Sequence, residues 1–169
     1  NIGAVYRSLG QDNKALEYYQ QALATERKLW EKPKTAALIN NIATIYISKG
    51  NYDKAMEFLQ QALVFAHQMN DKQGASSIFS SIGVAYRSIG QHDKALEYYQ
   101  QVLNMERQLG RAPQTATVLS NIGFVYYLKK KYVYAIKYYS ESIELIEKLR
   151  KTATGDARRD YLASQIGAY

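Results

Sequence analysis

Amide and hydroxyl side chains that can bind a peptide backbone recur in this chain at a spacing of 40 residues. Asn1, Asn41 and Asn121, with Ser81 in the third position, form a ladder at that spacing. An asparagine amide offers both a donor and an acceptor, the pair needed to hold a backbone amide of an extended peptide. The alternative is that the ladder stabilises packing between repeats through side chain to backbone hydrogen bonds.

Two arginines and an aromatic pair stand close to this ladder in the repeat. Arg7 and Arg87 are suited to pair with acidic side chains or with a C-terminal carboxylate of a ligand, and a solvated arginine is the alternative. Phe124 and Tyr127, with Leu128, form a candidate apolar anchor of the kind at which binding energy concentrates. The competing interpretation buries these apolar side chains under a final helix.

Residue patterns for catalysis are absent from the sequence. The chain has no cysteine, and its two histidines, His67 and His92, have no partner at a metal-ligand spacing. Glu17, Glu57 and Glu97 recur by repeat symmetry, which is typical of a solvated helix face. With no nucleophile elbow and no phosphate loop, the sequence predicts a protein that is not an enzyme and needs no metal or cofactor.

The charge of the chain is concentrated near its C-terminal end. Of a formal net charge of +7, residues 115 to 169 contribute nine Lys and Arg against five Asp and Glu. The run Lys129, Lys130 and Lys131 and the pair Arg158 and Arg159 fit either an acidic partner or a nucleic acid backbone; a solvated turn and a solvated helix face are the plainer interpretation. No apolar run is long enough to span a bilayer and no signal-peptide pattern opens the chain, so we expect a cytoplasmic protein without a membrane partner.

The ladder belongs to a longer repeat that predicts pairs of helices. Apolar residues before each glycine follow helical spacing, as in Ile39, Ile42, Ile45 and Tyr46. Gly10, Gly50 and Gly90 then follow the last periodic residue, where a left-handed C-terminal cap is expected. In the fourth repeat the residue is Lys130, which predicts either another turn geometry or a strained residue. A small residue in each first helix, at Gly3, Ala43, Gly83 and Gly123, predicts close approach of a neighbouring helix.

A second, longer helix is expected to start near an acidic residue, at Asp12, Asp53 and Asp93. Short polar connectors, Glu31 to Lys34, Asp71 to Gly74 and Arg111 to Gln114, should separate the pairs. Most of the sixteen tyrosines keep core periodicity, so packing is a better account of them than stacking on a ligand. The fold class predicted is an all-α solenoid of antiparallel helix pairs wound into a right-handed superhelix with a C-terminal capping helix.

The predicted repeats are residues 1–34, with a truncated first helix, then 35–74, 75–114 and 115–154. After the segment Thr152 to Gly155, residues 155–169 should form a ninth helix that covers the end of the stack or begins a further repeat. Because the first repeat starts within a helix, we expect the chain to be a piece of a longer protein. All four repeats and the last helix are expected to form one domain.

The ordered set Phe79, Ile82, Gly83, Tyr86, Ala95 and Tyr99 resembles the signature of tetratricopeptide repeats, and matching sets stand one repeat earlier and one later. The period of 40 instead of 34 is similar to the long-repeat group of kinesin light chains, peptide-pheromone sensors and bacterial proteins that end in CHAT domains, which are caspase-like proteases. The stretch "NIGAVYRSLGQDNKALEYYQQAL" is most like the CHAT-linked kind.

The resemblance implies a protein-interaction scaffold, the sensing part of a larger bacterial protein, which binds a peptide or helix in a concave groove lined by first helices. In the long-repeat relatives the asparagine slot contacts peptide main chain. The residues expected to bind are Arg7, Asn40, Asn41, Thr44, Ser80, Val84, Arg87, Asn121, Phe124 and Tyr127. The alternative is a structural module that assembles with copies of itself through its open ends, and nucleic-acid binding through the C-terminal basic residues is a third hypothesis.

Overall fold

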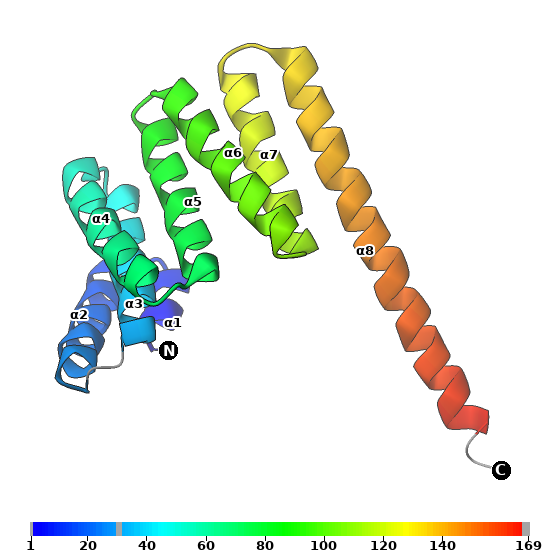
Figure 1. Ribbon diagram of the computed structural model, residues 1–169, viewed down its shortest axis with the longest axis horizontal. Helices are drawn as coiled ribbons and strands as arrows, with labels where there is room; N and C mark the ends of the chain where they lie inside the picture. Colours follow the sequence, from blue (N-terminus) through cyan, green and yellow to red (C-terminus); the bar gives the residue numbers. More distant parts are fainter. Residues whose placement is uncertain (1, 30–31, 167–169) are drawn as a thin grey trace. The chain divides into compact units, whose positions relative to one another are not determined.

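The computed structural model describes the backbone of residues 2–29 and 32–166 and the side chains of residues 2–25 and 35–155. Within these ranges helices joined by short turns are the only regular secondary structure, with no strand, so the all-α prediction is confirmed (Figure 1). The helices are α1 (Ile2–Ser8), α2 (Asp12–Leu29), α3 (Lys32–Ser48), α4 (Tyr52–Gln68), α5 (Lys72–Ser88), α6 (His92–Gln108), α7 (Ala112–Leu128) and α8 (Tyr132–Ile166). None of these helices is long and apolar enough to cross a membrane within the described residues.

The chain forms two compact units, residues 1–105 and 106–169. In the first, α3 packs on α2, α4 and α5, and α1 packs on α2. In the second, α7 and α8 lie side by side as an antiparallel pair (Figure 1). Consecutive helices are therefore neighbours within each unit, as expected of a solenoid built from helix pairs.

The turns inside the helix pairs share one backbone geometry. Gly10, Gly50 and Gly90 have positive φ angles of 69°, 72° and 77°, as the sequence predicts for left-handed caps. Lys130 has a φ of 58°, and the Lys131 amide donates to the Tyr126 carbonyl at 2.9 Å, just as Gln91 donates to Tyr86. The fourth repeat therefore keeps the same turn and holds a lysine in a conformation that favours glycine.

The polar connectors between repeats are shorter than the sequence suggests. α5 begins at Lys72 and α7 at Ala112, so three of the four residues assigned to each of these connectors are already helical. The Gly74 amide donates to the Asp71 carboxylate at 2.8 Å, which caps α5, and Pro113 fits the first turn of α7 because that turn needs no amide proton there. Asn70 and Gly110, with φ of 51° and 66°, supply the left-handed residues of these turns.

The small residues of the first helices lie under tyrosines of the second helices. A Cβ added to Gly83 would stand 2.6 Å from Cε1 of Tyr99, and one added to Gly3 would stand 2.8 Å from Cε1 of Tyr19. In the other unit, a Cβ on Gly123 would stand 3.1 Å from Cδ1 of Tyr139. The predicted close approach is thus the fit of a tyrosine ring on a glycine.

A second set of aromatic rings links the two helices of each pair. The stacked pairs are Tyr6 with Tyr18, Tyr46 with Phe58, Tyr86 with Tyr98 and Tyr126 with Tyr138, with centroids 5.2 to 5.5 Å apart. In the first three pairs a lysine ammonium lies over the tyrosine ring of the first helix: Lys14 over Tyr6, Lys54 over Tyr46 and Lys94 over Tyr86. Packing therefore accounts for most of the tyrosines described, as predicted.

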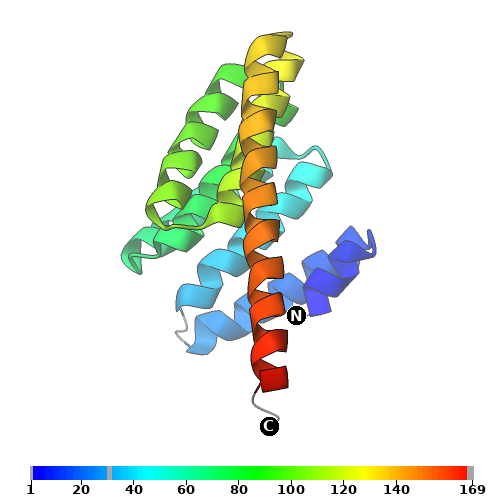
Figure 2. The same ribbon diagram turned by 90° about the vertical axis from the view of Figure 1, so that its right-hand side faces the viewer.

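The expected break before a ninth helix is wrong. α8 continues without interruption from Tyr132 through Gly155 to Ile166 (Figure 2). The Thr152 hydroxyl donates to the Lys148 carbonyl at 3.2 Å and the Thr154 hydroxyl to the Arg150 carbonyl at 2.9 Å, so both threonines are satisfied within the helix. The side chains of residues 156–169, Arg158 and Arg159 among them, lie outside those described.

Candidate interaction surfaces

The predicted binding residues of the first unit belong to α1, α3 and α5, and Val84 among them packs against the core. Arg7 is exposed, while the other six are half-buried: Asn40, Asn41, Thr44, Ser80, Val84 and Arg87. The amide oxygen of Asn40 is buried and has no hydrogen-bond partner among the described residues. Asn40 therefore combines a partly accessible side chain with an unsatisfied acceptor, a state that costs about 1–3 kcal/mol.

One position of the predicted ladder, Ser81, and the nearby predicted binding residue Thr44 are engaged in local hydrogen bonds. Ser81 is buried, and its hydroxyl donates to the Ser77 carbonyl at 3.2 Å. The Thr44 hydroxyl donates to the Asn41 carbonyl at 2.7 Å, which leaves only its lone pairs for a ligand. Asn1 lies outside the described residues. Asn41 and Asn121, both half-buried, are the ladder positions that keep an accessible amide.

The arginines act on tyrosine hydroxyls of the second helices. Burial raises the pKa of Tyr99 to about 12, and the positive charge of Arg87 opposes that rise. Burial likewise raises the pKa of Tyr19, and Arg7 opposes it. Each arginine thus lies close enough to the tyrosine hydroxyl of its own helix pair for its charge to lower the pKa of that tyrosine.

In the second unit, Asn121 is half-buried, while Phe124 and Tyr127 are exposed by 38% and 54%. The two rings stack with centroids 6.3 Å apart, and Tyr127 also meets Tyr132 of α8 at 5.9 Å. The alternative of burial under a final helix finds no support within the described residues, because α8 runs on past Gly155 instead of turning back. These rings are accessible to a ligand.

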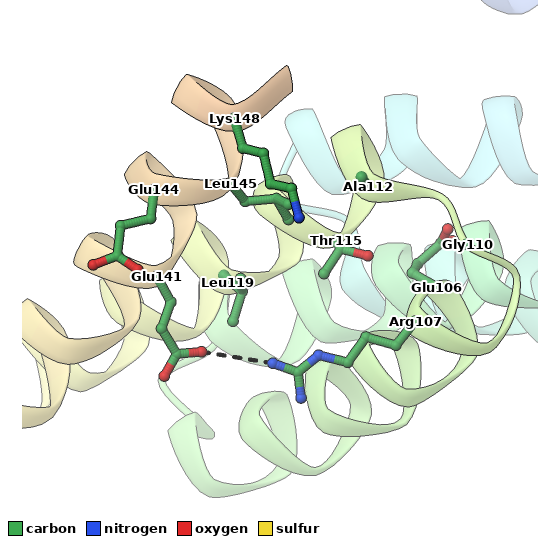
Figure 3. Close-up of a pocket in the computed structure, with 10 residues that line it drawn as sticks. All are labelled: Glu106, Arg107, Gly110, Ala112, Thr115, Leu119, Glu141, Glu144, Leu145 and Lys148. Carbon is green, nitrogen blue, oxygen red and sulfur yellow. Dashed lines mark ion pairs between the residues drawn. The ribbon is translucent and has the colours of Figure 1, made fainter. Parts of the chain in front are cut away.

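The second unit also contains a cavity of about 490 Å³ that the sequence did not predict (Figure 3). It lies between the end of α6, the first half of α7 and the middle of α8. The lining residues are Glu106, Arg107, Gly110, Ala112, Thr115, Leu119, Glu141, Glu144, Leu145 and Lys148. None of the ten predicted binding residues lines it.

Two ion pairs of different exposure border this cavity. Arg107 of α6 faces Glu141 of α8 across 3.6 Å at the surface, as Figure 3 shows. Behind it, the nearly fully buried carboxylate of Glu106 lies 3.3 Å from Nε of Arg111. One repeat earlier the same positions hold Ala66 and Asp71, so the paired change from Ala and Asp to Glu and Arg was the signal available in the sequence.

The described side chains do not suggest a metal centre. No group of three or more histidine, aspartate or glutamate residues within residues 2–25 and 35–155 is arranged to hold a metal ion. His67 is exposed on α4 and His92 is half-buried at the start of α6. The accessible chemistry of the described surface is hydrogen bonding, charge pairing and aromatic contact.

Comparison with known proteins supports a repeat architecture. A family model described as "Tetratricopeptide repeat" matches residues 1–65 and 71–152. No curated protein sequence matches the chain.

Solved structures match the fold at low sequence identity. BtubC (BKLC) from P. vanneervenii aligns with a TM-score of 0.76 and 20% identity, over 88% of this chain and 62% of that one. A Rap protein complexed with Competence and Sporulation Factor gives 0.80 and 20%, over 85% and 40%. Aspartyl phosphate phosphatase F from Bacillus subtilis gives 0.80 and 18%, over 88% and 39%. This chain thus spans less than two thirds of the length of each.

Proposed function

Because the chain belongs to the tetratricopeptide repeat family, we propose that it is a non-enzymatic protein-interaction scaffold that binds an extended peptide or a helix on its first helices. The binding surface comprises Arg7, Asn40, Asn41, Thr44, Ser80, Val84 and Arg87 in the first unit, and Asn121, Phe124 and Tyr127 in the second. The Rap protein solved with Competence and Sporulation Factor shares the fold and supports a binding role of this kind.

The observation that carries this proposal is the accessible amide that recurs at one position of the repeat. Asn41 and Asn121 occupy equivalent positions of α3 and α7, and both stay half-buried outside the core. Each amide can donate to a peptide carbonyl and accept from a peptide amide, so it recognises main chain independently of sequence.

The remaining residues give such a ligand direction and anchoring. The exposed Arg7 and the half-buried Arg87 attract carboxylates through charge-assisted hydrogen bonds. Phe124 and Tyr127 offer an apolar surface to a large side chain of the ligand. An acidic residue or a free C-terminus matches the arginines of the first unit, and a large apolar side chain matches the aromatic rings of the second.

The experiment selects peptides from a random library on the purified chain and measures their affinities for variants by calorimetry. Asn41→Ala, Asn121→Ala and Arg87→Ala should each weaken binding by about 1–3 kcal/mol, because a buried polar partner is lost. Gln61→Ala, on the exposed outer face of α4, is the matched control and should change nothing. If all three variants bind as tightly as the parent, the first helices are not the binding surface.

We place this scaffold in the cytoplasm, as the sensing part of a larger bacterial regulator. The support is the resemblance of the repeats to the CHAT-linked kind, which would place a protease domain beyond Tyr169. Reading the gene past that residue tests the assignment, since a domain with a His and Cys pair should follow. Another kind of domain would remove the protease assignment and leave the scaffold intact.

A second candidate function, self-assembly, is favoured by the apolar face that α8 presents to solvent. Val133, Ile136, Ile143 and Ile146 are all more than half exposed. At the repeat position of Ile143, Leu23 and Leu103 are buried instead. An exposed apolar stripe of this kind marks an interaction surface, here for a second copy of the chain.

A further inference from the structure

The turn between α7 and α8 departs from the other repeats at several adjacent positions. Lys130 replaces a glycine, and Lys131 replaces the Gln or Asn of the other turns. Leu128 replaces a serine found at Ser8, Ser48 and Ser88. The first turn of α8 has no acidic residue, whereas the first turns of α2, α4 and α6 contain Asp12, Asp53 and Asp93. The changes remove negative charge and add positive charge and apolar surface.

The lysine that lies over a tyrosine ring in the first three repeats is also replaced. In the fourth repeat this position holds Tyr134, which stacks on Tyr126 with centroids 5.2 Å apart. Tyr127 stacks on Phe124 and meets Tyr132 at an interplanar angle of 59°. Phe124, Tyr127, Tyr132 and Tyr134 are each between 38% and 55% exposed. The turn thus carries two groups of contacting rings, Phe124 with Tyr127 and Tyr132, and Tyr126 with Tyr134, together with two exposed lysines, Lys130 and Lys131.

Lys130 adopts a conformation that its residue type disfavours. With a φ of 58° it occupies the left-handed region, where glycine avoids the steric cost of a Cβ. Non-glycine residues held in such regions cluster at binding sites and switches. A lysine held there presents a positive charge at the tip of the turn, two residues before Tyr132 in the sequence.

We propose that residues 124–134, the α7–α8 turn surface, form a docking site for an acidic peptide segment that carries large apolar or aromatic side chains. Lys130 and Lys131 complement the acidic residues of such a segment, and the angle between Tyr127 and Tyr132 receives its apolar side chains. The proposal rests on the proposed function, because Phe124 and Tyr127 belong to both surfaces. It extends the binding site from the first helix α7 to the start of the second helix α8.

A peptide fits the arrangement of the rings better than a single-stranded nucleic acid does. Successive bases stack on separate aromatic platforms along a basic groove. Here Phe124 and Tyr127 already stack on each other, and Tyr134 stacks on Tyr126, so each of these rings is part of a stacked pair and contributes to an apolar surface, not to a row of separate platforms. Such a surface suits the packing of side chains.

The test measures fluorescence anisotropy of a labelled peptide in which glutamate alternates with phenylalanine. Two companion probes replace either all glutamates by glutamine or all phenylalanines by serine, and a labelled oligothymidylate is the fourth probe. The chain should bind the first peptide, with affinity falling as salt is added, and should bind each companion more weakly. Binding of oligothymidylate more tightly than the peptide would overturn the proposal in favour of a nucleic acid.

Two variants locate the binding on the turn. Lys130→Gly with Lys131→Gln copies the turns at Gly10 and Gly90, and it should weaken binding of the first peptide by about three- to tenfold. Tyr127→Ala with Leu128→Ser should weaken it by about tenfold or more. The matched control is Asn70→Gly with Lys72→Gln in the first unit. It places glycine at another residue of positive φ and removes one lysine charge, and it should leave peptide binding unchanged.

The same variants distinguish three causes of weak binding: a folding defect, failure of the proposed first-helix surface, and failure of the turn proposal. In the variant Lys130→Gly with Lys131→Gln, the glycine removes the strain of the left-handed backbone at residue 130. The urea midpoint of this variant should therefore stay the same or rise while its affinity for the first peptide falls. If Asn41→Ala and Arg87→Ala weaken binding and the turn variants do not, the first-helix surface binds peptide and the turn proposal is wrong. The turn proposal also fails if the parent chain does not bind the first peptide.

Discussion

At the residue scale, each glycine of the first helices is matched to the ring packed on it. Gly3, Gly83 and Gly123 lie under tyrosines, whereas the second repeat holds Ala43 with Leu59, both fully buried, at the same two positions. The absence of a Cβ and the presence of a wide ring are therefore two halves of one contact. The small residues alone predict the close approach of a neighbouring helix. Which of the sixteen tyrosines packs on each glycine could not be predicted from the sequence.

This matching predicts a compensating pair of substitutions. Gly83→Ala should lower the free energy of unfolding by about 1–3 kcal/mol, because its Cβ would stand 2.6 Å from Cε1 of the buried Tyr99. Combining it with Tyr99→Leu recreates the pair of Ala43 and Leu59 and should recover part of that loss. Urea unfolding of the single and double variants measures both effects. A double variant less stable than Gly83→Ala would show that the ring and the glycine are not matched.

Tyr99 also predicts a loss of stability at high pH. Its pKa is about 12 in the folded chain, and a tyrosine in an unfolded chain has a pKa near 10. The neutral hydroxyl is thus favoured by folding, so this contribution is complete below about pH 10 and is lost as the pH rises towards 12. The expected change is about 2–3 kcal/mol.

Urea unfolding at several pH values tests this contribution, with Tyr99→Phe as the control. The phenylalanine variant should lose less stability between pH 10 and 12 than the parent, because it lacks the buried group that ionises. Equal slopes for the two proteins in that interval would assign the alkaline sensitivity to other tyrosines.

At the element scale, the helix pairs and their turns could be predicted, and the helix ends only in part. Periodic apolar residues and Gly10, Gly50 and Gly90 correctly gave the pairs and their caps. The segment Thr152 to Gly155 was read as a break, yet Gly155 has no positive φ, and glycine in an exposed helix costs only about 1 kcal/mol. The low helix propensity of one glycine is too small an effect to end a helix whose preceding turns are well formed.

The cavity of the second unit escaped prediction for a related reason. Its ion pairs join residues from α6, the following turn and α8, and only the fold brings these together. The exchange of Ala66 for Glu106 and of Asp71 for Arg111 looked like ordinary surface variation, because burial of Glu106 cannot be read from one repeat position. The local pattern specified the helices, and their packing specified the site.

The two ion pairs should differ in their contribution to stability. Arg111→Ala leaves the buried carboxylate of Glu106 without this guanidinium and should cost about 2–4 kcal/mol. Arg107→Ala removes a more exposed pair with Glu141 and should cost less than about 1 kcal/mol. The double variant Glu106→Ala with Arg111→Ala removes both charges and should be more stable than Arg111→Ala alone.

Thermal or urea unfolding of these variants measures the difference. A loss from Arg111→Ala no larger than that from Arg107→Ala would mean that Glu106 is stabilised by other groups. Both outcomes concern the second unit, which holds all four of these side chains.

At the scale of the whole molecule, repeats of this type gain stability by burying each helix pair against the next. α8 departs from that rule on one face, where Val133, Ile136, Ile143 and Ile146 are exposed. Their positions fall within one side of the helix, since spacings of three and seven residues keep a common face. The spacing is also symmetric about the midpoint of the set, which is the pattern a two-fold contact between copies requires.

Two copies of α8 packed antiparallel would place Val133 against Ile146 and Ile136 against Ile143, because both pairs have the same midpoint. Self-association through this face should therefore give a concentration-dependent dimer in light scattering. Ile136→Lys with Ile143→Lys should abolish the dimer, because each contact would then bury an unpaired ammonium. Val64→Lys, at an exposed apolar residue of α4, is the matched control and should leave the dimer intact. A parent chain that stays monomeric at all concentrations would exclude self-assembly through α8 and leave peptide binding as the remaining proposal.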